Sequence, residues 1–234
     1  MVELSWHGRV AVLGLNRPEA RNALNLELLA ALEGRLGEVV DAHCVVLQGA
    51  GGVFCAGADL RERQRMTSEQ RTQHTRLIAS LCDRIESLAV PSVAWVEGYC
   101  LAGGLELALA CDVRFASESA VFGFPEVKLG IFPGADGPLR LTRLIGPGRA
   151  ARLLYSGARL SCAEAVAIGL AEQGDALKWA DQVAGHSQVA VRALKAGLRA
   201  SCGLPFGQAQ AVVRQYREPL DGSADYEAAL ARWC

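Results

Sequence analysis

The stretch from Val93 to Ala116, VAWVEGYCLAGGLELALACDVRFA, constrains the fold of this chain more than any other. Its first apolar run ends in a glycine turn, a short apolar segment follows, and a second apolar run comes after Asp112. This order predicts a strand, a tight turn, a buried helix and another strand. The helix carries one carboxylate, Glu106, where burial of an ionised group is costly unless a partner compensates it.

A glycine pair, Gly103 and Gly104, stands where this helix begins. Glycine lets the backbone approach another group closely, and the free N–H groups of a helix N-terminus collect partial positive charge. An acid beside a preformed anion site indicates chemistry on a carbonyl group.

The residues before this stretch predict a parallel crossover. Buried strands are expected over 10–15 and 44–47, and an amphipathic helix over 26–40, with Asn25 as its N-cap, lies between them. A strand, a helix and a strand in this order imply two parallel strands.

Helices and loops fill most of the remaining chain. Residues 61–76 are charged and unpatterned, which favours a solvated loop or an irregular helical excursion, and a second amphipathic helix is expected from about Arg71 to Leu88. A strand over 120–124 leads into the loop that carries Glu126. The strand signal ends at Ala171. Further helices are predicted over 139–145, 149–155, 162–168 after a Ser161–Glu164 capping box, 176–184, 187–200, 207–218 and 224–232.

Composition excludes several classes of function. The net charge of −1, from 24 Lys and Arg against 25 Asp and Glu, offers no basic surface for nucleic acid. No run reaches the roughly 18 to 20 apolar residues of a membrane span, and no targeting segment opens the chain. The eight cysteines, Cys234 included, lie scattered without a C-x-x-C pair, as small buried side chains do in a reducing compartment. We expect a soluble, cytoplasmic protein with no nucleic-acid or membrane partner.

Three features together point to carbonyl chemistry. Gly57 permits a tight turn from which the N–H of Ala58 can face outward, and the turn at Gly103 offers a second backbone N–H. Two such donors from separate loops can form an oxyanion hole. Two carboxylates in an apolar site, Glu106 and Glu126, can hold different protonation states and serve as base and acid.

Each feature also has a simpler explanation. Glycines after strands often only make turns. Glu106 would then be a buried helix residue paired with an arginine, Glu126 an exposed loop acid, and Asp59 a cap for the next segment.

Four segments of the chain resemble successive signatures of the crotonase superfamily, the enoyl-CoA hydratase/isomerase family. They are NRPEARNALN, GAGGVFCAGADL, VEGYCLAGGLELALACD and FGFPEVKLGIFPG, and their order and spacing match over most of residues 10–170. The resemblance implies an α/β fold in which a spiral of β-β-α repeats over 1–174 holds the active site. It also implies a helical trimerisation region over 175–234, often assembled as a dimer of trimers.

The resemblance further implies an acyl-CoA thioester substrate, a role in fatty acid metabolism and a set of site residues. The backbone N–H groups of Ala58 and Gly103 would hold the thioester oxygen, and Glu106 and Glu126 would hold a water molecule and move its protons. This favours reversible hydration of a 2-enoyl-CoA. No metal or redox cofactor is expected, because coenzyme A is part of the substrate. Substrate and CoA contacts are implied at Arg21, Ala23, Ala58, Asp59, Leu60, Arg61, Gly103 and Gly134.

The chain departs from the family pattern at two places. Asp136 and Pro138 interrupt a usually glycine-rich loop, and the added carboxylate is expected to change either the pKa of the acid glutamate or the shape of the acyl pocket. The chain is also expected to be shorter than typical members after Ala171, and its end, DYEAALARWC, lacks their aromatic-plus-lysine pattern. Alternative functions are double-bond isomerisation, dehydration of an acyl group on acyl carrier protein, and a non-catalytic role as an interaction or RNA-binding scaffold.

Overall fold

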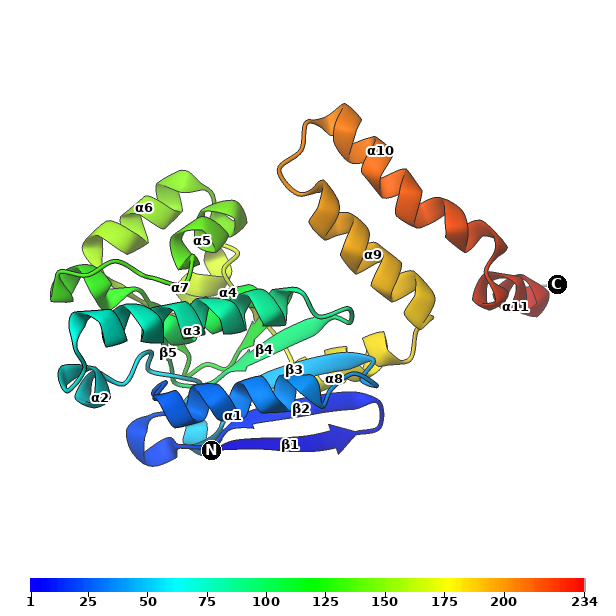
Figure 1. Cartoon of the computed structure of the whole chain (residues 1–234). Helices are drawn as coiled ribbons and strands as arrows, with labels where there is room; N and C mark the ends of the chain where they lie inside the picture. Colours follow the sequence, from blue (N-terminus) through cyan, green and yellow to red (C-terminus); the bar gives the residue numbers. More distant parts are fainter. Residues whose placement is uncertain (234) are drawn as a thin grey trace.

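Two sheets organise the fold (Figure 1). The computed structural model describes residues 1–233. The larger sheet has the strand order β1-β2-β3-β4-β6-β9, and the smaller has the order β5-β7-β8. Only β1–β2 and β7–β8 pair antiparallel. The strands are β1 (Val2–His7), β2 (Val10–Leu15), β3 (Cys44–Gly49), β4 (Ser92–Val96), β5 (Tyr99–Leu101), β6 (Val113–Ala116), β7 (Val121–Gly123), β8 (Arg159–Ser161) and β9 (Glu172–Gln173).

Helices cover the sheets and form the whole C-terminal region (Figure 1). The α-helices are α1 (Leu26–Gly37), α2 (Leu60–Gln64), α3 (Ser68–Glu86), α4 (Gly103–Ala110), α5 (Gly137–Ile145), α6 (Pro147–Ser156), α7 (Cys162–Ala167), α8 (Ala176–Ala184), α9 (Gln188–Ser201), α10 (Phe206–Arg217) and α11 (Ala224–Trp233). The 3-10 helices are η1 (Pro18–Ala20), η2 (Ala50–Gly52), η3 (Pro125–Leu129) and η4 (Glu218–Gly222).

The chain winds through the two sheets as a spiral of β-β-α turns. In one turn β4 joins the larger sheet, β5 joins the smaller sheet, and α4 follows. In the next turn β6 and β7 repeat this path before η3 and α5. This is the α/β spiral with a helical C-terminal region that the sequence predicts.

The central stretch folds in the predicted order, except that the short strand β5 lies between the turn and the buried helix. Every residue of α4 is buried, so the helix has no solvated face and its one acid, Glu106, lies inside the protein. The buried guanidinium of Arg114 in β6 holds the far end of this helix. It donates to the carbonyl oxygens of Ala108 (3.3 Å), Cys111 (2.8 Å) and Leu170 (2.9 Å). These bonds satisfy groups that a helix C-terminus otherwise leaves without partners.

The first crossover and several helix caps are confirmed. Asn25 caps α1 by accepting from the N–H of Leu28, and β2 and β3 pair parallel. Helix α1 ends at Gly37, before the predicted position 40. The capping box of Ser161 and Glu164 opens α7 as predicted.

The prediction for residues 61–76 is wrong in part. This charged segment contains α2 and the first half of α3, which begins at Ser68 and not near Arg71. A capping box starts α3, because the side chain of Thr67 accepts from the N–H of Gln70 and the Gln70 side chain accepts from the N–H of Thr67. The many exposed charged residues of this segment obscured the capping box in the sequence.

Four strands were also missed. Strand β1 has one buried residue, Val2, and therefore no alternating pattern. Strand β5 follows β4 where only a turn was predicted, and β8 pairs antiparallel with β7 just before α7. The strand signal does not end at Ala171, because β9 pairs with β6 directly after it. Strands β5, β8 and β9 have only two or three residues and take their pairing from tertiary contacts rather than from local sequence.

Burial of the cysteines agrees with the sequence prediction. Six of the seven cysteines in the described part of the chain are buried free thiols, Cys202 is exposed, and Cys234 lies outside the described residues. Within residues 1–233, the helices are all too short or too polar to span a membrane.

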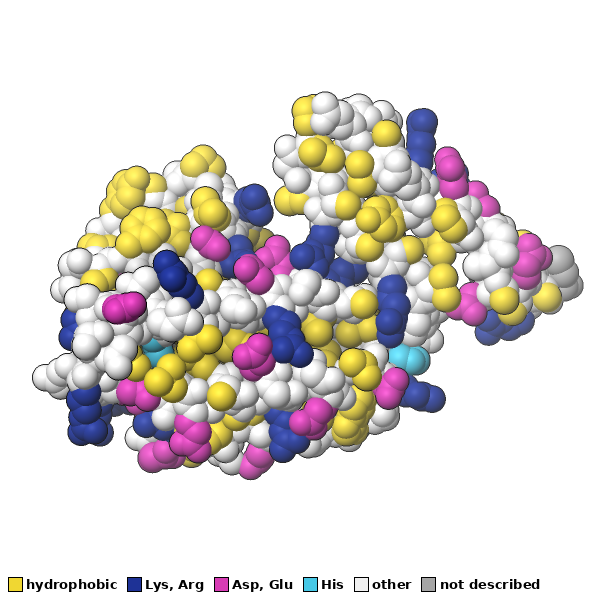
Figure 2. Space-filling view, viewed as in Figure 1, with side chains coloured by type: hydrophobic (Ala, Val, Ile, Leu, Met, Phe, Trp, Pro, Cys, Tyr) yellow, Lys and Arg dark blue, Asp and Glu magenta, His cyan; other side chains and the backbone are white. Residues whose placement is uncertain are grey.

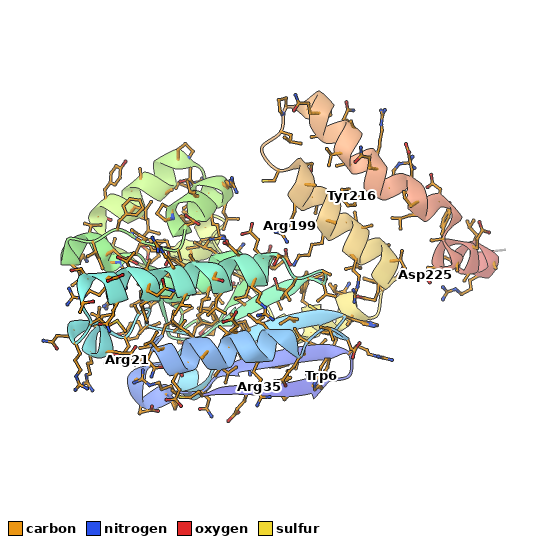
Figure 3. The ribbon with its side chains drawn as sticks, in the orientation of Figure 1. Trp6, Arg21, Arg35, Arg199, Tyr216 and Asp225 are labelled. Atoms are coloured by element: carbon orange, nitrogen blue, oxygen red, sulfur yellow. The ribbon has the colours of Figure 1, made fainter. Side chains whose placement is uncertain are left out.

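Helices α9, α10 and α11 form an arm that projects from the body (Figure 1). The helix predictions for this region hold to within a residue or two. The buried ammonium group of Lys195 in α9 anchors the arm by donating to Asp112 Oδ2 (2.7 Å) and to the Val90 carbonyl (2.9 Å). Arg199, labelled in Figure 3, reaches from α9 to the carbonyl of Glu86.

Replacing Arg114 should destabilise the whole body of the protein. In Arg114→Met, three carbonyl groups lose a buried, charged donor, and we expect the free energy of unfolding to fall by about 3 kcal/mol. Urea denaturation followed by circular dichroism measures this change. Arg149→Met, at an exposed position of α6, is the control and should change stability by less than about 0.5 kcal/mol. Equal stability of the two variants would contradict the assigned role.

Candidate active site

A cleft of about 520 Å³ opens between the η1 loop, α2, α3 and the N-terminus of α4. Arg21, labelled in Figure 3, lies on its rim beside α2. Every site residue that the sequence predicts lines this one cleft: Arg21, Ala23, Ala58, Asp59, Leu60, Arg61, Gly103, Glu106, Glu126 and Gly134. The fold therefore brings together residues that are more than a hundred positions apart in the chain.

The two candidate N–H donors meet because Gly57 has no side chain. Its φ is +96°, and a Cβ atom there would lie 2.6 Å from Ala102 Cβ and 3.3 Å from Gly103 N. The backbone after Gly57 can thus run directly beside the turn into α4. Within residues 1–233, no hydrogen bond uses the N–H of Ala58 or that of Gly103. Both groups are available to an oxygen atom in the cleft.

Ala102 holds the turn into α4 in a strained conformation. Its φ of 51° and ψ of −128° are rarely adopted by a residue with a side chain. The Ala102 N–H donates to the Gly123 carbonyl (3.0 Å), and its carbonyl accepts from the N–H of Glu106 (3.0 Å). These bonds fix the strained residue, which directs the first turn of α4 towards the cleft.

Glu106 is buried and held by the backbone of the loop before α5. Its side chain is 3% exposed, and Oε1 accepts from the N–H groups of Ala135 (2.7 Å) and Gly137 (3.1 Å). The partner of this carboxylate is therefore a loop backbone and not an arginine side chain, which corrects one alternative. Burial raises the pKa of Glu106 above its usual value, although the two N–H groups and Arg140 oppose that shift.

Glu126 is buried as well, so the alternative of an exposed loop acid is wrong. Its side chain belongs to η3 and is 6% exposed, and Oε2 has no hydrogen-bond partner in the described part of the chain. Burial raises the pKa of Glu126 to about 7, and the nearby charge of Glu106 adds to this shift. The two glutamates thus differ in environment: Glu106 Oε1 accepts from two loop N–H groups, whereas Glu126 Oε2 has no partner in the described residues.

Asp136 influences Glu106 rather than Glu126. It is an exposed residue with a φ of 61°, and it lies between the two N–H groups that bind Glu106. Its charge contributes to the raised pKa of Glu106 and is not among the groups that shift the pKa of Glu126. The expected effect of the added carboxylate on the pKa of the acid glutamate is therefore wrong, because the charge of Asp136 acts on Glu106 instead.

Asp59 caps α2, as one alternative holds, and it also lines the cleft. Its Oδ1 accepts from the N–H groups of Arg61 (2.9 Å) and Glu62 (3.1 Å), and its Oδ2 lies 2.6 Å from Arg17 Nη1. Burial opposes ionisation, yet the bonds from Arg17 and from the backbone outweigh it and hold the pKa of Asp59 below its usual value.

The sequence missed several groups that shape the cleft. Arg17 and Arg63 line it together with Arg21 and Arg61, and Phe132, 78% exposed, adds an apolar wall. Asn22 lies outside the cleft but holds its loops: it donates to the carbonyls of Ala50 (3.0 Å) and Val53 (2.6 Å) and accepts from the N–H of Arg17 (2.8 Å). The only sequence signal for Asn22 was its place in a polar loop, which did not reveal complete burial.

Metal-ligating side chains do not gather in this cleft or elsewhere in residues 1–233: no three or more His, Cys, Asp or Glu residues are placed to hold an ion.

The enoyl-CoA hydratase/isomerase family model matches residues 6–218, and the chain belongs to this family. It is 36% identical to the enoyl-CoA isomerase/hydratase fer4 of Mycosarcoma maydis over 93% of this chain and 87% of that protein. It is 38% identical to the short-chain-enoyl-CoA hydratase of Clostridium acetobutylicum over 83% of this chain and 79% of that protein. Identity to the putative enoyl-CoA hydratase/isomerase YngF of Bacillus subtilis is 46%, over 70% of this chain and 64% of that protein.

Solved structures match nearly the whole chain. The crystal structure of an enoyl-CoA hydratase from Bacillus anthracis superposes with a TM-score of 0.96 at 35% identity, over 99% of this chain and 95% of that one. The expectation of a shortened region after Ala171 is not supported by this comparison. The helical region matches along with the spiral.

The unequal environments of the two acids should be visible by titration. In ¹³C NMR of the side-chain carboxyls, Glu126 should titrate with a midpoint at a pH of about 7. In Glu106→Gln the like charge is absent, so the Glu126 midpoint should move down.

Glu164 serves as an internal reference for this titration. It is exposed, and bonds from Ser161 hold its pKa below the usual value. A Glu126 midpoint no higher than that of Glu164 would contradict the assigned burial.

Proposed function

We propose that this protein is an enoyl-CoA hydratase that adds water reversibly across the 2,3 double bond of a 2-enoyl-CoA thioester. One observation carries the proposal: two buried glutamates with different environments share a cleft with two unused backbone N–H groups. The names of the relatives at 36% and 38% identity support the same class of reaction.

The N–H groups of Ala58 and Gly103 form the oxyanion hole in this proposal. They donate to the thioester carbonyl oxygen, which gains negative charge as the enolate forms. Donors fixed by the backbone need no reorganisation at that moment, and the loss of one such donor typically costs about 10²- to 10³-fold in rate. Polarisation of the carbonyl also makes the β-carbon of the enoyl group electrophilic.

The two glutamates handle the protons. Glu106, fixed by Ala135 and Gly137, takes a proton from the attacking water. Glu126 delivers a proton to the α-carbon, and its pKa of about 7 keeps the acid form populated near neutral pH. In dehydration the roles reverse, and the pair titrates as a coupled unit.

The arginines of the cleft rim suit the phosphates of coenzyme A. Arg21, Arg61 and Arg63 line the cleft, while Arg17 is paired with Asp59. Guanidinium groups bind phosphate oxygens through paired donors. No metal or redox group enters this mechanism, because the proton transfers use the two carboxylates and coenzyme A arrives with the substrate. Fatty acid breakdown or synthesis is the kind of metabolism in which such a substrate occurs.

Isomerisation of the double bond is the second candidate. The relative named isomerase/hydratase favours it, and the same oxyanion hole and one acid would suffice for it. Dehydration of an acyl group on acyl carrier protein is a third reaction of the same kind. Both use the same cleft, so substrate assays separate them from hydration. A non-catalytic scaffold is disfavoured by the two buried acids.

The arm supports a proposal about assembly. Figure 2 shows hydrophobic side chains at several places on the surface of the arm. The exposed apolar residues of the arm include Val189, Leu194, Leu198, Phe206 and Val213. Apolar surface on this scale typically marks an interface. We propose that copies of the chain assemble through the arm as a homotrimer or a dimer of trimers. The buried free thiols further support a reducing compartment, the cytoplasm.

Substitution of either acid should abolish hydration. With a short-chain 2-enoyl-CoA, Glu106→Gln and Glu126→Gln should each lower kcat by at least about 10²-fold, because one proton transfer loses its donor or acceptor. The measurement is the loss of the conjugated enoyl absorbance. Glu118→Gln, at an exposed turn, is the matched control and should retain wild-type kcat.

The substrate tested decides between the candidates. Wild-type protein that isomerises a 3-enoyl-CoA without hydrating any 2-enoyl-CoA would refute the hydratase proposal. Turnover only on carrier-protein thioesters would refute coenzyme A as the carrier. Tight binding of RNA at moderate salt, with no turnover, would favour the scaffold.

A charge on the arm should disrupt assembly. Leu198 is 69% exposed in one chain, and burying an unpaired aspartate at an interface is strongly unfavourable. Leu198→Asp should therefore sediment as a single chain, whereas the wild type and Leu198→Met should sediment as three or six chains. A wild-type monomer would contradict the proposed assembly.

A further inference from the structure

We propose that His74 is a positioning residue that holds the oxyanion segment in place through the carbonyl of Leu24. His74 lies in α3 and does not line the cleft, so it acts through its neighbours and not on the substrate. The inference rests on the proposed role of Ala58 as a donor to the thioester oxygen.

Leu24 links His74 to Ala58. The N–H of Leu24 donates to the Gly57 carbonyl (2.8 Å), and its own carbonyl accepts from the N–H of Asp59 (3.0 Å). Leu24 is therefore hydrogen-bonded to the residues on both sides of Ala58. Leu24 and Ala58 themselves form an isolated parallel bridge. The position of the Ala58 N–H depends on where this carbonyl is held.

His74 supplies the second bond to that carbonyl. Its ring is 0% exposed, and Nε2 lies 3.0 Å from the Leu24 oxygen. A carbonyl oxygen only accepts, so Nε2 carries the proton and Nδ1 is the bare nitrogen. Nδ1 is buried without a partner in the described residues. Burying an imidazole nitrogen without a hydrogen-bond partner costs free energy. The bond from Nε2 to the Leu24 carbonyl is the interaction that offsets this cost.

The same face of α3 supports the other donor. Ile78 lies one helical turn after His74, and a Cβ atom at Gly103 would lie 3.6 Å from Ile78 Cδ1 and 3.3 Å from Leu24 Cδ1. Leu24 therefore contacts both halves of the oxyanion hole, its backbone next to Ala58 and its side chain next to Gly103. His74 fixes the one residue that spans them.

Burial keeps the imidazole neutral. Burial and the nearby Arg63 lower the pKa of His74, while the Leu24 carbonyl, Glu62 and Asp59 oppose the shift. Glu62 Oε2 lies 3.9 Å from His74 Nε2, beyond hydrogen-bond distance, and accepts instead from the N–H of Leu26. The neutral form contributes stability that is fully present above the unfolded pKa of about 6.5 and is lost as the pH falls towards the lower folded value.

Two substitutions separate the donor from the shape of the ring. His74→Phe fills the space without a donor, and His74→Gln places an amide N–H near the position of Nε2. With a short-chain 2-enoyl-CoA, His74→Phe should lower kcat by about ten- to a hundredfold and change KM by less than about threefold, because the displaced N–H acts mainly in the transition state. His74→Gln should recover kcat to within about threefold of the wild type.

Ile85→Ala is the control for lost packing. Ile85 is buried in the same helix about three turns from His74, and it makes no bond to Leu24. It should lower the melting temperature and leave kcat within about twofold. Equal losses of kcat in His74→Phe and His74→Gln, or wild-type kcat in both, would overturn the inference.

A second measurement decides the inference without any turnover. In ¹⁵N–¹H spectra of the full-length protein, the Ala58 amide resonance should move in His74→Phe and return in His74→Gln, and His74 should show the Nε2-protonated tautomer at neutral pH. An unmoved Ala58 resonance in His74→Phe would overturn the positioning role. Absence of hydration by the wild type would refute the proposed function alone, because the Ala58 resonance still reports the link to His74.

Discussion

The close approach of two backbones, at Gly57 and at the turn of Ala102, is the constraint on which the site depends. A side chain at Gly57 would collide with Ala102 Cβ at 2.6 Å. Because that space is empty, Ala58 and Gly103 come from separate turns of the spiral and yet line the same cleft. The strained conformation of Ala102 and the hydrogen bonds of Leu24 both maintain this close approach of the two backbones. The surrounding β-β-α turns act as a frame that keeps two loops in register.

Burial of the two acids is the second constraint, and the fold treats them differently. Glu106 receives two backbone donors from a loop about thirty residues further along the chain, whereas Glu126 Oε2 receives none. One carboxylate is thus stabilised in its charged form and fixed in place. Burial raises the pKa of both acids, but the bonds from Ala135 and Gly137 oppose the shift at Glu106, whereas the charge of Glu106 adds to the shift at Glu126. Two identical side chains are thus placed in different surroundings.

The sequence predicts the parts of this arrangement that depend on local pattern. Val93–Ala116 shows its strands and its buried helix because apolar runs and glycines mark them, and Asn25 and Ser161 mark helix starts. The partners of Glu106 could not be predicted, since Ala135 and Gly137 act through backbone N–H groups that any residue except proline carries. Burial of Asn22 and His74 was hidden for a related reason: each is a polar residue in a polar stretch, and tertiary contacts alone enclose it. Strand β1 has a single buried residue and β9 has only two residues, so neither shows an alternating pattern.

The proposed oxyanion donors both belong to the main chain, which changes how the protein tolerates genetic variation. A substitution at Ala58 or Gly103 leaves the N–H in place unless proline removes it, so replacing these side chains would not reveal the donors. Activity is instead sensitive to mutation at residues that carry no reactive group. At Gly104 a Cβ atom would lie 2.4 Å from the Cys55 carbonyl oxygen, and at Gly137 it would lie 2.7 Å from Glu106 Cγ. In such a protein the positions most damaging to alter are those where nothing but hydrogen can be accommodated.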